Sequence, residues 1–246
     1  MKVTDRIHVV GSGKNGFSLT DSYDCHVYLL NGGDEYALID AGSGRDVEGI
    51  VAAIEREGLD PGRTRQMLLT HAHADHAAGA AGLQERLGLR VLASPPVAAG
   101  VRAADERVAS LDVARQAGAY PPDFMLRRCP VDGELADGVT VQVGDLTVEV
   151  VATPGHAAGH LSFVLRHDGQ SSVFCGDAFF FGGRILLQNT WDCSVQESIA
   201  SVERLASLNV DGLFPGHFTF AVQHGRRQFE PALASIASLL PPAQLS

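Results

Sequence analysis

The amino-acid sequence predicts a layered α/β or α+β domain in which two β-sheets are covered by helices. Short apolar runs with the pattern of strands alternate with amphipathic stretches with the spacing of helices along most of the 246 residues. Hydrophobic residues make up 45% of the chain and charged residues 20%, which is typical of globular proteins. This length corresponds to one or two domains and allows a large core without disulfides.

The strands are predicted from short runs rich in Val, Ile, Leu, Phe and Tyr that end at turn residues. In the first half of the chain they are residues 6–10, 27–30, 36–40, 67–70 and 90–93. In the second half they are residues 139–143, 146–152, 161–165, 172–175 and 213–214. Gly144-Asp145 separates two of these runs by two residues only, which is typical of a hairpin turn.

The helices are predicted from apolar residues that recur every three or four positions. Val47, Ile50, Val51 and Ile54 show this spacing, and Gly58 marks the end of that helix. Further helices are expected over residues 77–87, 195–208 and 228–240. Residues 95–130 are helix-prone and bounded by prolines, so they are interpreted either as an inserted helical lid or as a plain surface helix.

Charge and composition disfavour several classes of partner. The net charge of −10 repels nucleic-acid phosphates and anionic lipid, and no apolar run approaches the ~18 residues of a membrane-spanning helix. Asp5 and Arg6 lie where a signal peptide would have its apolar stretch. The four cysteines have no CxxC spacing, which fits a reducing compartment. We therefore expect a cytoplasmic protein without nucleic-acid or membrane partners.

Three histidines and an acid follow the strand predicted at residues 67–70, in the sequence His71-Ala-His73-Ala-Asp75-His76. Residues i and i+2 of an extended segment project to one side, so His71 and His73 can bind one metal ion. Asp75 and His76, where the chain turns into a helix, can face a neighbouring ion. Imidazole nitrogen and carboxylate oxygen suit zinc, and also iron or manganese.

Further candidate ligands lie where other strands give way to loops. His156 ends Thr-Pro-Gly-His, Asp177 ends Cys-Gly-Asp, and His217 ends Pro-Gly-His. Asp40 ends the strand at residues 36–40 in the same way. Loops on a rigid scaffold are common places for functional residues, so these side chains are expected to converge with the histidine motif.

Asp40, HAHADH, TPGH, GD and PGH, in this order, resemble the metallo-β-lactamase-fold hydrolase superfamily. The resemblance implies a four-layer αββα sandwich, formed as a single domain by residues 1–246 with a helical insertion at about 95–130. It implies His71, His73 and His156 as ligands of one metal. It implies Asp75, His76 and His217 as ligands of the other, Asp177 as the bridging carboxylate, and Asp40 as an acid that orients a ligand.

The implied activity is hydrolysis by two Zn²⁺ ions, with iron or manganese as alternatives. A water shared by two cations about 3.5–4 Å apart is ionised at neutral pH and can attack an ester, thioester or lactone carbonyl. Asp75 is expected to hold the hydroxide and relay its proton to the leaving group. The partner is then a small acyl substrate, and its apolar contacts are expected at Phe179, Phe180, Phe181 and Trp191 unless these pack in the core.

The sequence leaves more than one branch of the superfamily open. Residues 176–183 are similar to hydroxyacylglutathione hydrolases, but few residues follow His217 compared with the C-terminal glutathione-binding domain of those enzymes. An alternative is a persulfide dioxygenase that holds one iron through His71, His156 and Asp177. Asp75 and His217 favour hydrolysis, and a phosphoesterase or a non-catalytic effector are lesser alternatives. Homodimers are common for such folds, although no segment specifies one here.

Overall fold

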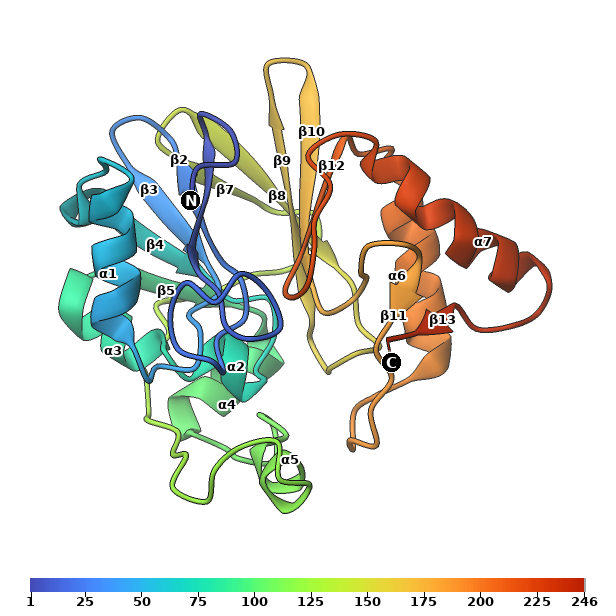
Figure 1. The fold of residues 1–246 in the computed structure, drawn as a ribbon, viewed down its shortest axis with the longest axis horizontal. Helices are drawn as coiled ribbons and strands as arrows, with labels where there is room; N and C mark the ends of the chain where they lie inside the picture. The colour runs from blue at the N-terminus through green and yellow to red at the C-terminus, as the bar shows by residue number, and fades with distance from the viewer. Residues whose placement is uncertain (246) are drawn as a thin grey trace. The chain divides into compact units, whose positions relative to one another are not determined.

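The structure, a computed structural model, describes residues 1–245 and divides into two compact units (Figure 1). Unit 1 comprises Met1–Leu135 with Val143–Asp145, and unit 2 comprises Ala136–Gln142 with residues 146–245. Each unit contains its own main sheet and its own cluster of buried apolar side chains. The mixed α/β class predicted from the sequence is confirmed, whereas the single domain remains a prediction.

Unit 1 is built on a six-stranded sheet in which strand order follows the chain. Its strands are β1 (Ile7–Gly11), β2 (Val27–Asn31), β3 (Tyr36–Ile39), β4 (Thr64–Leu68), β5 (Arg90–Ala93) and β6 (Gly133–Glu134). The first three strands pair antiparallel, and β3 to β6 pair parallel. The parallel pairing brings the carboxyl ends of β3 and β4 to one edge of the sheet.

The helices of unit 1 lie between the strands of this sheet along the chain, and three of them pack on it. They are α1 (Val47–Arg56), η1 (Pro61–Arg63), α2 (Ala74–Ala77), α3 (Ala80–Leu87), α4 (Pro95–Ala103) and α5 (Leu111–Gln116). Helix α1 packs on β1, α3 on β4 and β5, and α4 on β5 (Figure 1). Asp46 caps α1 by accepting a hydrogen bond from Gly49 N at 2.9 Å, which satisfies one of the unpaired N–H groups at the helix start.

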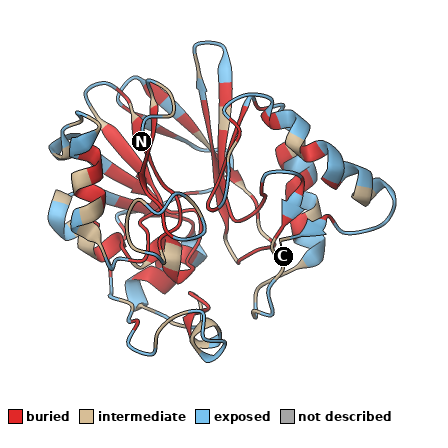
Figure 2. Cartoon of the chain, in the orientation of Figure 1, coloured by how far each residue is buried: buried red, intermediate tan, exposed pale blue. Residues whose placement is uncertain are grey.

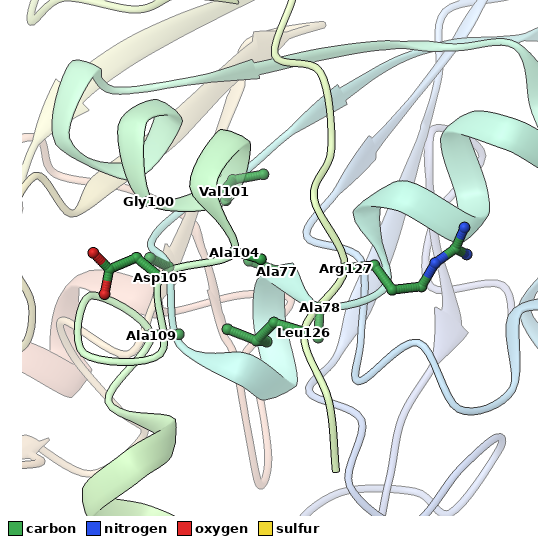
Figure 3. A pocket seen from close by; sticks show the side chains of 10 residues that line it. Ala77, Ala78, Gly100, Val101, Ala104, Asp105, Ala109, Leu126 and Arg127 are labelled. Atoms are coloured by element: carbon green, nitrogen blue, oxygen red, sulfur yellow. The ribbon is translucent and has the colours of Figure 1, made fainter.

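The segment predicted as an insertion, residues 95–130, contains α4 and α5 and rests on the turn that carries the histidine motif. Phe124 is buried in a cluster with Ala74, Ala109 and Leu111. A small pocket beside this cluster is lined mainly by alanine, glycine, valine and leucine side chains (Figure 3). The two charged residues at its edge, Asp105 and Arg127, point away from its centre, so the pocket offers no polar anchor.

Unit 2 is built on a five-stranded sheet with the order β12-β10-β9-β8-β7. The strands are β7 (Thr140–Val143), β8 (Leu146–Ala152), β9 (Leu161–His167), β10 (Gln170–Gly176) and β12 (Gly212–Pro215). Strands β8, β9 and β10 pair antiparallel, and β12 adds parallel to β10. The carboxyl ends of β8, β10 and β12 therefore point the same way.

The remaining elements of unit 2 lie after β10. They are β11 (Arg184–Ile185), α6 (Val195–Ser207), η2 (Gly225–Phe229), α7 (Glu230–Ala237) and β13 (Ala243–Gln244). Strands β11 and β13 form a separate parallel pair. Figure 2 shows the strands of both units buried over most of their length, while α6 and α7 each have an exposed side.

Two sequence-based boundaries differ from the structure for physical reasons. The strand expected at residues 67–70 is β4 (Thr64–Leu68), because Thr70 N donates to the Asp40 side chain instead of extending the strand. The helix expected over residues 77–87 is split into α2 and α3 around Gly79, whose N–H donates to Gly42 O. Within residues 1–245, no helix is long and apolar enough to cross a membrane.

We expect Gly79→Ala to lower the free energy of unfolding by about 1–3 kcal/mol. A Cβ at position 79 would lie 2.0 Å from the carbonyl oxygen of Ala41, and that backbone atom cannot move without displacing Asp40. Urea-induced unfolding measures the effect. Gly62→Ala is the control, because its nearest atom is a side-chain oxygen of Asp60 at 3.1 Å. Equal midpoints for the two variants would contradict the prediction.

Candidate metal centre

Asp40 organises the ligand residues of unit 1. It directly follows β3, it is 1% exposed, and its carboxylate accepts hydrogen bonds from Thr70 N at 2.8 Å and Thr70 Oγ1 at 2.8 Å. It also accepts from His76 Nδ1 at 2.8 Å. Since Thr70 follows β4, the carboxylate ties the ends of two neighbouring strands together. The contact with His76 has the geometry predicted for an acid that orients a metal ligand.

The histidine motif directly follows Thr70, and its side chains form one cluster in unit 1. His71 and His76 are 0% exposed, and their ring centroids lie 4.1 Å apart. The centroids of His71 and His73 lie 4.6 Å apart, and Asp75 Oδ2 lies 3.8 Å from His76 Nε2. The ring atom His71 Nδ1 contacts Thr70 Oγ1 at 2.9 Å. Hydrogen bonds at Nδ1 therefore hold the rings of His71 and His76, which makes their Nε2 atoms the candidate ligand atoms.

Cys25 is a neighbour of this cluster that the sequence did not indicate as part of the site. Its Sγ lies within 4.8 Å of the ligand atoms of Asp40 and His76, and its N–H donates to Asp75 O at 3.2 Å. Burial raises the pKa of the Cys25 thiol to about 12, so it is neutral at physiological pH. No motif spacing marks this cysteine, which is why it could not be found from the sequence.

Unit 2 brings its three predicted ligands together at the ends of three strands. His156 follows β8, Asp177 follows β10 and His217 follows β12. The oxygen Asp177 Oδ2 lies 3.7 Å from His156 Nε2 and 3.6 Å from His217 Nε2. All three residues are at most 7% exposed. One carboxylate oxygen of Asp177 thus lies near the Nε2 atoms of two imidazoles.

The turn before His156 is positioned by α6. A Cβ at Gly155 would lie 2.2 Å from Ser198 N, and its φ of +127° favours glycine, so this position accepts no side chain. Ser201 Oγ donates to Pro154 O at 2.6 Å. The ring of His156 donates from Nδ1 to Leu186 O at 3.1 Å, which again makes Nε2 the candidate ligand atom.

His160 supports Asp177 through a chain of buried hydrogen bonds. Asp177 N donates to His160 Nε2 at 3.2 Å, so this ring nitrogen is an acceptor and Nδ1 carries the hydrogen. His160 Nδ1 lies 3.0 Å from Thr153 Oγ1, which lies 2.8 Å from Ser162 Oγ. His160 is therefore a positioning residue for the Asp177 backbone.

The four aromatic residues predicted to contact substrate separate into two groups. Phe179 is 0% exposed and stacks on Phe229 with centroids 4.2 Å apart, and Phe180 is 1% exposed. These two side chains pack in the core, as the alternative reading of the sequence allowed. Phe181 and Trp191 are 40% and 52% exposed, so only they remain available to a ligand.

The donor set in each unit fits divalent metal binding. Imidazole nitrogens and carboxylate oxygens are buried side by side, and three of the histidines are held through Nδ1 by a threonine, a carboxylate or a carbonyl group. Such bonds fix the tautomer and raise the basicity of metal-ligating imidazoles. Clusters of this kind are unfavourable without a cation, because they concentrate lone pairs in a region of low dielectric.

Residues 21–217 match the family model described as the metallo-beta-lactamase superfamily. The chain belongs to this superfamily. It is 30% identical over 217 residues to a hydroxyacylglutathione hydrolase of Acidiphilium cryptum, covering 87% of this chain and 73% of that protein. A hydroxyacylglutathione hydrolase of Pseudomonas paraeruginosa is 30% identical over 188 residues, covering 75% of this chain and 58% of that protein.

Solved structures show the same fold. A subclass B3 metallo-beta-lactamase of Bradyrhizobium japonicum has a TM-score of 0.67 at 20% identity, covering 88% of this chain and 76% of that chain. A native metallo-beta-lactamase from Legionella gormanii has a TM-score of 0.67 at 21% identity, covering 88% and 78%. The predicted metallo-β-lactamase fold is confirmed, and the chain is a metal-dependent hydrolase of this superfamily.

We expect His160→Ala to weaken zinc affinity about 10- to 100-fold, because the Asp177 N–H loses its acceptor and the carboxylate loses its fixed position. His160→Gln should recover part of the affinity, since its amide oxygen can accept the same bond. Competition with a chromophoric chelator measures the dissociation constant. His167→Ala, which removes a histidine from the far end of β9, is the control. Wild-type affinity in a folded His160→Ala protein would contradict the assigned role.

We expect iodoacetamide at pH 8 to modify Cys193 alone in the native protein. The thiolate is the nucleophile, and burial raises the pKa of Cys25 to about 12 and of Cys129 to about 11. Cys175 is also fully buried, whereas Cys193 is partly exposed. Mass spectrometry counts the labels, and Cys193→Ser should leave none. Labelling of Cys25 before unfolding would show that the cluster opens.

Proposed function

We propose that the protein is a dinuclear zinc hydrolase that cleaves acyl thioesters of small molecules. Its similarity to hydroxyacylglutathione hydrolases supports this proposal. The observation that carries this proposal is the complete donor set at the strand ends of the two units. Each predicted ligand is present, and His71, His76 and His156 present Nε2 by the same kind of bond at Nδ1. A binding module has no need of so many oriented donors.

In this proposal two ions are held by the ligands that the family resemblance implies. His71, His73 and His156 would hold one ion, and Asp75, His76 and His217 would hold the other, with Asp177 as the shared carboxylate. When bound, two divalent cations supply Lewis acidity and a nucleophilic hydroxide at neutral pH. Zinc suits this donor set and needs no redox chemistry, with iron or manganese as alternatives.

The residues of the chain supply orientation and proton transfer. Asp75 is the ligand of unit 1 with the most exposed side chain, at 19%, and its Oδ2 lies 3.8 Å from His76 Nε2. It takes a proton from the attacking water and delivers it to the leaving thiolate, so that water and thioester become acid and thiol. Asp40 holds the His76 ring during this exchange. Phe181 and Trp191 provide exposed apolar surface for the acyl group.

The surrounding charge supports a small substrate rather than a nucleic acid. With 29 acidic and 19 basic residues, the chain repels a phosphate backbone.

The test is metal content together with turnover of purified protein. We expect about two zinc ions per chain and hydrolysis of acyl thioesters. We expect Asp177→Ala to lower kcat/KM more than about 100-fold without a large change in Tm, because the variant loses both its bridging ligand and the nucleophile. Glu203→Ala, which removes an exposed carboxylate from α6, should retain activity.

Two results would contradict the proposal. One iron per chain with oxygen consumption on persulfides would assign a dioxygenase instead. Two zinc ions without turnover of any thioester would keep the metal centre but reject the substrate class.

A further inference from the structure

A surface loop of unit 1, residues 11–24, is held rigidly beside the histidine motif. Asp24 is 2% exposed and accepts hydrogen bonds from Thr20 Oγ1 at 2.6 Å, Ser43 N at 2.7 Å and Ser43 Oγ at 2.6 Å. The Ser12 hydroxyl accepts from Phe17 N at 2.7 Å. The loop therefore has buried polar anchors at both ends, which is more than a connection between β1 and β2 needs.

Two cations converge on one aromatic ring of this loop. Lys14 Nζ lies 5.0 Å from the centroid of the Tyr23 ring, and Arg45 Cζ lies 5.8 Å from it. Both distances are within the range of cation–π attraction. The backbone holds the arrangement, because Lys14 N donates to Ser22 O at 3.0 Å. Lys14 and Arg45 are exposed and Tyr23 is half-buried, so the charged ends face solvent.

This group lies next to the metal ligands of unit 1. Tyr23 packs against the cluster that contains Ala74, the residue before Asp75. Its ring also lies 5.4 Å from Tyr120 and 6.3 Å from Phe124, measured between centroids. Two residues after Tyr23, Cys25 N donates to Asp75 O. The group of Lys14, Tyr23 and Arg45 is thus joined to the segment that carries Asp75 by the packing of Tyr23 and by one backbone hydrogen bond.

The positive charges of Lys14 and Arg45 are only partly neutralised by carboxylates. Arg45 pairs with Asp21 at 3.6 Å, but no carboxylate of the described residues forms an ion pair with Lys14. Lys14 is one of only two lysines in the chain, and the other, Lys2, pairs with Asp5 at 2.7 Å. In a protein with a net charge of −10, an unneutralised lysine and a neighbouring arginine form a local site of attraction for an anion.

We propose that Lys14, Tyr23 and Arg45 form an anion-binding subsite that receives a carboxylate or phosphate group of the thiol part of the substrate. The inference rests on the proposed thioesterase function and adds its substrate class, an acyl thioester whose leaving thiol is anionic. Lys14 and Arg45 attract the anion, and Tyr23 offers its hydroxyl and the ring that holds both cations. The positive charge of Lys14 and Arg45 strengthens substrate binding and takes no part in cleavage of the thioester bond.

Binding and turnover of matched thiols test this subsite. Thioesters with one acyl group are compared on glutathione, which carries carboxylates, on coenzyme A, which carries phosphates, and on N-acetylcysteamine, which is neutral. We expect Lys14→Gln and Arg45→Gln each to raise the ratio of anionic to neutral KM about 3- to 10-fold. Lys14→Arg should restore most of the ratio, and added NaCl should raise the anionic KM of the wild type. The anionic thioester whose KM changes more shows whether the subsite binds a carboxylate or a phosphate.

Lys2→Gln is the matched control, because it removes the same charge from the other lysine and should keep the wild-type ratio. Calorimetry with S-hexylglutathione and the S-hexyl thioether of N-acetylcysteamine gives a readout that needs no turnover. Failure of all thioester hydrolysis would reject the proposed function, while the ratio of dissociation constants would still report on the subsite. Equal binding of anionic and neutral analogues by the wild type, or equal ratios in Lys14→Gln and Lys2→Gln, would overturn the proposal.

Discussion

The hydrogen-bonded carboxylate of Asp40 is the interaction on which the ligand arrangement of unit 1 depends. A buried carboxylate is costly unless donors surround it, and Asp40 has the N–H and hydroxyl of Thr70 and the ring of His76. Charge-assisted bonds of this kind are strong in a low dielectric. Since Asp40 and Thr70 end neighbouring parallel strands, the same bonds that satisfy the carboxylate also set the direction of two imidazoles.

Unit 2 also orients its candidate ligands by hydrogen bonds, but here the bonding partners are neutral groups. The carbonyl of Leu186 orients His156, and His160 accepts the N–H of Asp177. Here the backbone has to approach closely, which is why Gly155 lies against the first turn of α6. In both units a hydrogen bond at Nδ1 decides which ring nitrogen is the candidate ligand atom. The proposed ligands therefore depend on residues outside the predicted ligand set.

The proposed metal ligands and the proposed substrate contacts lie on different parts of the fold. The proposed ligands follow β4, β8, β10 and β12, whereas the proposed substrate contacts lie on loops: Lys14, Tyr23 and Arg45 in unit 1, and Phe181 and Trp191 in unit 2. This division allows substrate preference to change without disturbing metal binding. The chain shares its fold with metallo-beta-lactamases and is more similar in sequence to hydroxyacylglutathione hydrolases.

The sequence by itself determined the chemistry of the protein. Apolar periodicity located most strands and helices, and the HAHADH motif with His156, Asp177 and His217 indicated the superfamily. These features are local, so they can be read from neighbouring residues. The tertiary structure alone decided which distant side chains meet. It buried Phe179 and Phe180, broke a helix at Gly79, and placed Cys25 beside His76 and Lys14 beside Tyr23. Such contacts arise from packing between segments, and no spacing along the chain encodes them.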